Sequence, residues 1–327
     1  MEEKGKKGRM DYTLLLIVVL LVVIGLVILY STSAYNGQVK FHDSFYYLKK
    51  QAFATVLGIV LMLFVAGMDY HIWQRLAVFG YLAAVALSVA VMLFGREING
   101  SKRWLALGPF SFQPSEFAKV ALILFLADLV TKNVKTIGKM WTLCRIMFWI
   151  LPIVGLVGAS NLSTAIIILG IGVILIFVAS PKYAQFALMG IAGACFMGIF
   201  LALESYRLER LAIWRNPEKY EKGYQTLQGL YAIGSGGVFG VGIGNSVQKL
   251  GFVPEAQNDM IFSIICEELG LAGAGIIVFL FLLLIWRFFL IASGSRDLFG
   301  ALIATGAMAH MMIQVILNIA VVTRSEE

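Results

Sequence analysis

Asp259 stands where chemistry at a membrane surface would need a carboxylate, at the last polar position before a long apolar run. Glu255, Gln257 and Asn258 come just before it, and Glu267 follows inside the run. A carboxylate in this place can take a proton from an attacking hydroxyl or hold a divalent cation. An aspartate beside a helix start is also a common helix cap. Because these acids crowd one region, which a cap does not require, the sequence favours a reaction site.

Glu116 and Lys119 form a second candidate group, inside an apolar run that begins near Pro114. Residues three apart share one face of a helix, so the two side chains can pair. A charged group at membrane depth is costly unless it is paired or hydrated. The pair could fix the packing of helices, or it could lie in a substrate cavity and shape its electric field.

Lys102 and Arg103 place two positive charges beside Trp104, shortly before the run that contains Glu116. At the outer interface such a group would suit the phosphate of an anionic lipid headgroup. Basic and aromatic side chains also gather at membrane interfaces simply as anchors. Both interpretations put this segment at the membrane surface.

The elements that must position these groups belong to a chain too apolar for a soluble globule. Hydrophobic residues make up 60% of its 327 positions and charged residues 14%, whereas a soluble domain carries about a quarter of charged residues. Helices and closed barrels can span a bilayer, and these runs lack the alternation of barrel strands. We therefore predict an all-α polytopic membrane protein, with about nine transmembrane helices forming a single domain over residues 1–327. The spans are predicted at 12–33, 50–68, 73–94, 113–130, 145–160, 162–180, 183–203, 260–290 and 298–322.

The distribution of Lys and Arg in short loops predicts a multi-pass protein of the cytoplasmic membrane with its N-terminus inside. The longest loop, residues 204–259, then lies outside and precedes the eighth span. It contains an amphipathic stretch, residues 206–214, that can lie in the headgroup plane. A glycine-rich stretch, residues 234–244, fits neither a Walker loop nor a dinucleotide fingerprint. Its glycines allow close approach to another helix or to a ligand phosphate.

The remaining composition excludes other classes of protein. The net charge of +7 suits the basic inner rim of a membrane protein, and no basic face or module predicts nucleic-acid binding. Cys144, Cys195 and Cys266 lack metal-ligand spacing, so we predict reduced packing residues. No motif predicts an organic cofactor.

Six segments of the chain carry motifs that are highly specific in combination. They are Asn99–Trp104, Phe112–Lys119, Gly223–Gln225, Gly236–Ser246, Gln248–Asp259 and Ile261–Gly270. In this order they resemble the SEDS family (shape, elongation, division and sporulation), which includes FtsW, RodA and SpoVE. The resemblance covers nearly the whole chain and is closer to FtsW and SpoVE than to RodA.

The resemblance implies a peptidoglycan glycosyltransferase that polymerises lipid II on the outer face of the cytoplasmic membrane. It implies a class B penicillin-binding protein as the transpeptidase partner, together with other divisome or elongasome membrane proteins. Asp259 falls on the essential aspartate of the family, and we expect it to act as a base or as a ligand of Mg²⁺ or Mn²⁺. The supporting residues of the predicted substrate cavity are Glu116, Lys119, Arg103, Trp104, Arg210, Gln225, Ser246, Lys249, Glu255 and Glu267. Among these, Arg103, Lys249 and Arg210 are expected to meet the phosphates.

The chain departs from the family pattern in two places. Family members often carry an acidic residue where this chain has Asn161. The family also continues through a tenth helix, whereas this chain stops at Glu327. We therefore expect a chain that lacks the last transmembrane helix, whether as a fragment, through a frameshift or as a genuine product.

Two other functions stay open at this point. A lipid II flippase or transporter would use the Glu116–Lys119 pair and a polar stripe formed by His310, Gln314 and Asn318. That stripe is also explained by hydrogen bonds between helices, and no internal repeat of the kind many transporters have is evident. A non-catalytic divisome scaffold is the third interpretation and agrees with a missing last helix.

Overall fold

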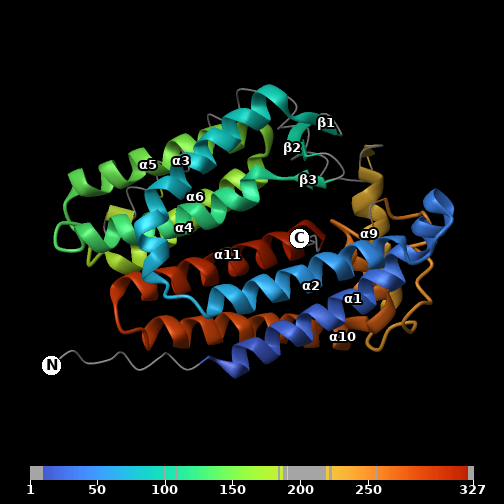
Figure 1. The fold of residues 1–327 in the computed structure, drawn as a ribbon. Helices are drawn as coiled ribbons and strands as arrows, with labels where there is room; N and C mark the ends of the chain where they lie inside the picture. The colour runs from blue at the N-terminus through green and yellow to red at the C-terminus, as the bar shows by residue number, and fades with distance from the viewer. Residues whose placement is uncertain are drawn as a thin grey trace. The chain divides into compact units, whose positions relative to one another are not determined.

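The computed structural model describes residues 10–98, 101–107, 110–182, 185–186, 190, 219–220, 223–254 and 256–322. This part of the chain is almost entirely helical (Figure 1). Within it, seven helices are long and apolar enough to cross a membrane. They are α1 (Tyr12–Phe41), α2 (Tyr46–Ala66), α3 (His71–Phe94), α5 (Met140–Ser160), α6 (Leu162–Ala179), α10 (Ile261–Ser293) and α11 (Leu298–Val322). Of the predicted span 183–203 only residues 185–186 and 190 are described, and the amphipathic stretch 206–214, Arg210 and Glu255 lie outside the described residues.

The chain divides into two compact units. Unit 1 comprises Met1–Met68, Leu201–Arg287 and Val315–Glu327, and unit 2 comprises Asp69–Phe200 and Phe288–Gln314. Helices α10 and α11 contribute residues to both units. The two candidate groups are therefore divided, with Asp259 in unit 1 and the Glu116–Lys119 pair in unit 2.

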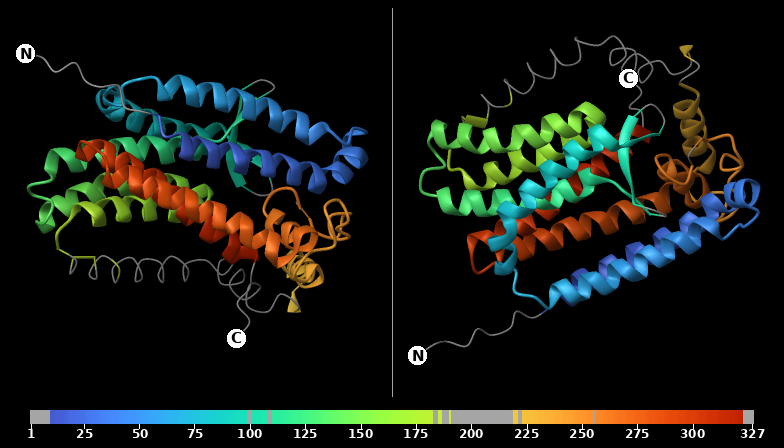
Figure 2. Two further views of the ribbon diagram at one scale, coloured as in Figure 1. Left: turned by 90° about the horizontal axis from the view of Figure 1, so that it is seen from below. Right: turned by 45° about the horizontal axis from the view of Figure 1, so that its top comes forward.

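In unit 1, α1 is longer than the predicted span of residues 12–33. The helix begins after Asp11, whose carboxylate accepts a hydrogen bond from Leu14 N at 2.9 Å. It runs eight residues further than predicted, to Phe41, and ends at His42 in the left-handed conformation with φ 56°. Hydropathy marks only the apolar part of a helix, whereas backbone hydrogen bonding continues beyond it. Helix α2 runs alongside α1 in all views (Figures 1 and 2).

Helix α10 is not the single continuous span predicted for residues 260–290. Gly270 within it has φ 68° and ψ −174°, so two helical segments meet at a break. A break inside a membrane-spanning segment frees backbone N–H and C=O groups, which must find partners elsewhere in the protein. The sequence analysis did not predict this interruption, because the hydropathy of the run is continuous.

Unit 2 is built around α4 (Pro114–Asn133), which packs against α3, α5 and α6. This helix matches the predicted span 113–130 but, with its four charged residues, is not among the seven most apolar helices. The predicted break between α5 and α6 is confirmed, since α5 ends at Ser160 and Asn161 caps α6 by accepting from Thr164 N at 3.2 Å. The core of α4 includes the fully buried Leu122 and Leu126.

A small three-stranded antiparallel sheet precedes α4 and was not predicted. Its strands are β1 (Arg96–Ile98), β2 (Ser101–Leu107) and β3 (Phe110–Phe112), in the order β1-β2-β3. Ile98 pairs with Ser101 across the first hairpin. The Asn99-Gly100 dipeptide between them is a strong hairpin signal that the helical interpretation passed over.

Candidate active site

Asp259 lies on an exposed turn immediately before α10. The neighbouring Ala256 and Met260 are buried, with 0% and 3% of their surface exposed, so the turn is anchored on both sides of Asp259. Within the described residues, the Asp259 carboxylate accepts no hydrogen bond and forms no ion pair. A helix cap would accept backbone N–H bonds, so the capping interpretation finds no support here. The carboxylate is available to a substrate or a cation.

Two side-chain amides brace the Asp259 turn from other helices. Asn36 of α1 donates from Nδ2 to Oε1 of Gln257 at 3.0 Å, and Gln257 is 8% exposed. Gln225 of α9 (Tyr224–Gly236) donates from Nε2 to the carbonyl of Pro254 at 3.3 Å. Gln225, a predicted cavity residue, thus holds the backbone that leads to Asp259.

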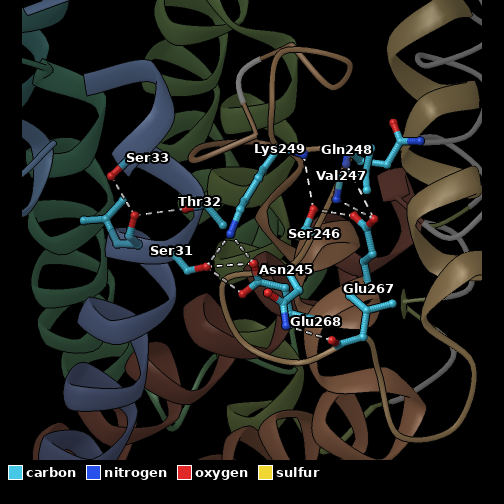
Figure 3. Close-up of polar contacts among 12 residues, drawn as sticks. Ser31, Thr32, Ser33, Asn245, Ser246, Val247, Gln248, Lys249, Glu267 and Glu268 are labelled. Atoms are coloured by element: carbon cyan, nitrogen blue, oxygen red, sulfur yellow. Dashed lines mark hydrogen bonds and ion pairs between the residues drawn. The ribbon is translucent and has the colours of Figure 1, made fainter. Parts of the chain in front are cut away.

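Glu267 and Ser246, two further predicted site residues, contact each other beneath the loop (Figure 3). The Ser246 hydroxyl donates to Oε2 of Glu267, and Val247 N donates to Oε1 at 3.0 Å. Glu267 and Ser246 are 3% and 2% exposed. Since hydrogen bonds to a charged carboxylate are stronger than neutral ones, Glu267 organises the turn that starts at Ser246.

Lys249 extends from that turn into a buried ion pair with Glu268 (Figure 3). Its Nζ lies 2.6 Å from Oε1 of Glu268 and 3.0 Å from Oγ of Ser31 on α1. The Ser31 hydroxyl lies 2.7 Å from both carboxylate oxygens of Glu268. The side chains of Lys249 and Glu268 are only 7% and 3% exposed. Lys249, which the sequence analysis expected to meet phosphate, is therefore paired with a buried carboxylate of the protein itself.

The glycine-rich stretch closes the break in α10 by backbone hydrogen bonds. Two carbonyls before the break accept from loop N–H groups, and two N–H groups after it donate to loop carbonyls. The four bonds are Val241 N to Glu267 O and Gly242 N to Glu268 O, each 2.9 Å, and Leu271 N to Gly237 O and Ala272 N to Val238 O, each 3.0 Å. A Cβ on Gly270 would lie 2.4 Å from Gly240 N, so no larger residue fits. The close approach that the sequence predicted is made to a helix.

In unit 2, Glu116 and Lys119 pair as their spacing predicted. Lys119 Nζ lies 2.8 Å from Oε2 of Glu116 and 3.5 Å from Oε1 of Gln314 on α11. The Lys119 side chain is 1% exposed, whereas that of Glu116 is 53% exposed. The pairing is confirmed, and the role of the pair in a substrate cavity stays a prediction.

Arg103 and Trp104 lie on strand β2 of the small sheet. Arg103 donates from Nε to the carbonyl of Ser160 at 3.1 Å, which ties β2 to the junction of α5 and α6. Trp104 stands opposite Arg96 in the neighbouring strand. Arg103 also lines a cavity of about 10 Å³ with Ser115 and Asn161, which is about the space of one water molecule.

Three polar residues that hold the Asp259 region were not predicted as site residues: Ser31, Asn36 and Glu268. Ser31 and Asn36 lie on α1, far from Asp259 in sequence. A signal was available for Ser31, because polar side chains within an apolar membrane helix are expensive and usually have a partner, whereas Asn36 lies beyond the predicted span 12–33. The identity of that partner depends on the fold, which brings α1 beside residues 249–268.

The described residues contain no group of three or more His, Cys, Asp or Glu side chains that could hold a metal ion. Mg²⁺ is commonly bound by one or two carboxylates together with substrate phosphates and water. The single exposed carboxylate of Asp259 fits that kind of site and does not fit a cage made by the protein alone.

Known proteins resemble the chain over nearly its whole length. A family model for cell cycle proteins of the FtsW, RodA and SpoVE type matches residues 12–324. Stage V sporulation protein E of Bacillus subtilis is 38% identical, with 97% of this chain and 88% of that protein aligned. A probable peptidoglycan glycosyltransferase FtsW of Trichlorobacter lovleyi is 34% identical, over 96% of this chain and 84% of that protein.

Two solved structures are similar in fold. One comes from work on the coordination of polymerization and crosslinking by a peptidoglycan synthase complex, with a TM-score of 0.80 and 28% identity over 95% of this chain and 87% of that chain. The other is the rod shape determining protein RodA of Thermus thermophilus, with a TM-score of 0.69 and 26% identity over 95% of this chain and 84% of that chain.

Proposed function

The chain belongs to the FtsW/RodA/SpoVE family of cell cycle proteins, and from this premise we infer that it is a peptidoglycan glycosyltransferase of cell division or sporulation. Relatives at 31–38% identity bear the names FtsW and stage V sporulation protein E. Seven helices able to span a membrane agree with a multi-pass membrane enzyme. The expected glycosyltransferase class is thus supported by relatives that align along nearly the whole chain.

We propose that the substrate is lipid II and that Asp259 is the catalytic base. The 4-hydroxyl oxygen of an acceptor GlcNAc attacks the anomeric carbon of a donor MurNAc, and Asp259 takes the proton of that hydroxyl. The new glycosidic bond forms as the bond to undecaprenyl pyrophosphate breaks, and the pyrophosphate leaves with the electron pair. A positioned general base contributes about 10²–10⁴-fold to such a step. The observation that carries this role is the exposed Asp259 carboxylate on a turn anchored on both sides.

We also propose a divalent cation, a partner and an orientation. In the alternative role, as a cation ligand in place of the base, the Asp259 carboxylate and the pyrophosphate oxygens would hold Mg²⁺ or Mn²⁺, which when bound supplies charge neutralisation for the leaving group. The phosphate contact expected of Arg103 stays a prediction. A class B penicillin-binding protein would supply crosslinking, in line with the peptidoglycan synthase complex in which one chain resembles this protein. The N-terminus would be cytoplasmic and the Asp259 turn extracytoplasmic, where lipid II presents its sugars.

The test is the product formed from purified lipid II by the purified protein with its penicillin-binding-protein partner. We expect glycan polymer and released undecaprenyl pyrophosphate in detergent. Movement of lipid II across liposomes without polymer would support the flippase alternative and overturn the proposal. Absence of both activities, together with restored division by an Asp259→Ala gene in a depleted strain, would favour the scaffold.

A further inference from the structure

The Lys249–Glu268 ion pair closes a loop of the chain that carries Asp259 at its middle. Its two charged atoms lie 2.6 Å apart, and both side chains are more than nine-tenths buried. The segment between them contains the buried anchors of the Asp259 turn, Ala256 and Met260. The pair therefore fixes both ends of the segment that presents the proposed base.

Helix α1 holds this loop at two levels. At its base, Ser31 is hydrogen bonded to both members of the ion pair, at 3.0 Å from Lys249 Nζ and 2.7 Å from Glu268 (Figure 3). Five residues further along α1, Asn36 donates to Gln257, two residues before Asp259. A rise of 1.5 Å per residue separates these levels by about 7.5 Å along the helix. Helix α1 thus contacts this loop both at the ion pair that closes it and at Gln257, close to Asp259.

The buried position of Lys249 argues against direct contact with substrate phosphate. Two of the three N–H groups of its ammonium are used by Glu268 and Ser31. Reaching a phosphate would require the ion pair to open, which would leave Glu268 as an uncompensated buried charge. The neighbouring carboxylate of Glu267 already accepts hydrogen bonds from Ser246 and Val247. It is therefore not a free alternative partner for the Lys249 ammonium.

We propose that Lys249, Glu268 and Ser31 are positioning residues that set the place of Asp259, and that Lys249 does not bind the substrate. The inference rests on the proposed function, because it concerns the geometry of the proposed base. A misplacement of about 1 Å at a reacting group can cost about 10²-fold in rate. If Lys249 acts by pairing with Glu268, exchanging the two charges between the positions should preserve its role. If Lys249 instead contacts a substrate phosphate, residue 249 must carry a positive charge.

The experiment is a charge exchange read out by steady-state kinetics. Lys249→Glu, Glu268→Lys and the double exchange are purified with the penicillin-binding-protein partner, and kcat and KM for lipid II are measured. We expect each single variant to lose about 10²-fold in kcat with KM within about threefold of the wild-type value. The double exchange should recover at least about tenfold of the lost kcat. A double exchange that folds but stays as inactive as Lys249→Glu, or shows a raised KM, overturns the proposal.

A second paired variant, without charges, keeps the proposal testable if the charge-exchanged protein does not fold. Lys249→Met combined with Glu268→Gln removes both buried charges together, which proteins tolerate far better than removal of one. We expect this variant to unfold near the wild-type temperature, to keep KM within about threefold of the wild-type value, and to lose less kcat than either single variant, because no uncompensated charge is left beneath Asp259. Failure of both paired variants to fold contradicts the proposal, because the charges themselves would then be required.

Two controls separate this inference from the proposed function. Lys49 and Asp43 form an exposed ion pair in unit 1, at 2.8 Å with side chains 70% and 36% exposed, so Lys49→Ala should leave kcat and KM unchanged. A wild-type protein that makes no polymer refutes the proposed function. An active wild-type protein whose paired variants fail refutes the positioning role alone.

Discussion

Two lysines are buried in the part of the chain that the structure describes, Lys249 in unit 1 and Lys119 in unit 2, and each is neutralised in a different way. Lys119 pairs with Glu116 one helical turn away, and that carboxylate is 53% exposed. Lys249 pairs with Glu268 across a loop, and both side chains are less than a tenth exposed. A local pair follows from spacing alone, whereas a non-local pair forms only when the fold brings its members together. The first can lend its carboxylate to solvent or substrate, and the second holds the chain in place.

Breaking the non-local pair should have the largest effect on stability. Lys249→Ala leaves Glu268 buried and uncompensated, which costs about 3–5 kcal/mol. Lys119→Ala should cost clearly less, about 1–2 kcal/mol, because the exposed side of Glu116 can be hydrated. Thermal unfolding of the two purified variants in the same detergent measures this difference. Equal losses would show that the exposure of the partner carboxylate does not decide the cost.

The break in α10 offers the next largest contrast. Gly270→Ala places a Cβ within 2.4–2.5 Å of backbone atoms of Val238 and Gly240 in the glycine-rich stretch, at a φ of 68°. We expect the free energy of unfolding to fall by about 1–3 kcal/mol because of strain at this position. A Cβ added to Gly155, in α5 of unit 2, would have nothing within 4 Å, so Gly155→Ala should be neutral or stabilising by about 0.5–1 kcal/mol. Unfolding midpoints of the two variants check the contrast, and a neutral Gly270→Ala would contradict the tight contact.

The smallest effect is expected at a partly exposed pair in unit 2, where Tyr70 donates to the carboxylate of Asp297. Burial raises the pKa of Asp297, but hydrogen bonds from Gly300 N and the Tyr70 hydroxyl lower it below its ordinary value of 3.8. A lowered carboxylate pKa stabilises the fold above the unfolded value, and that stabilisation is lost as the pH falls.

Tyr70→Phe should therefore cost about 0.5–1.5 kcal/mol at pH 7, and the difference from wild type should shrink below pH 3.8. Unfolding curves of both proteins at pH 7 and in acid provide the measurement. A difference that stays constant in acid would mean that the contact does not depend on the ionised carboxylate.

Much of the fold was predictable because hydropathy and helix periodicity are local properties. They identified the seven membrane helices of the described chain, and the spacing of Glu116 and Lys119 predicted their ion pair. The break at Gly270 and the sheet before α4 were missed, because a continuous apolar run hides an interruption and short strands leave little pattern. Ser31 was missed as a partner of Lys249 because that contact joins residues 218 positions apart.

The exposed turn of Asp259 followed from its place at the edge of an apolar run, but its support did not. The amides of Asn36 and Gln225 reach it from α1 and α9, and neither contact has a sequence signature. Lys249 was expected to meet the phosphates because the reaction that the resemblance implies needs cations to balance a departing pyrophosphate. Its side chain is buried against Glu268 of α10 and Ser31 of α1, two contacts that only the fold creates.

The central claim is that the Asp259 carboxylate performs the chemistry, and the rate of lipid II polymerisation by Asp259→Asn tests it most directly. Asp43→Asn makes the same substitution at an exposed aspartate in unit 1 that pairs with Lys49, so it serves as the matched control. With the partner bound and equal amounts of folded protein, we predict a loss of about 10²–10⁴-fold for Asp259→Asn and no loss for Asp43→Asn. An Asp259→Asn protein that polymerises lipid II at the wild-type rate would contradict the account.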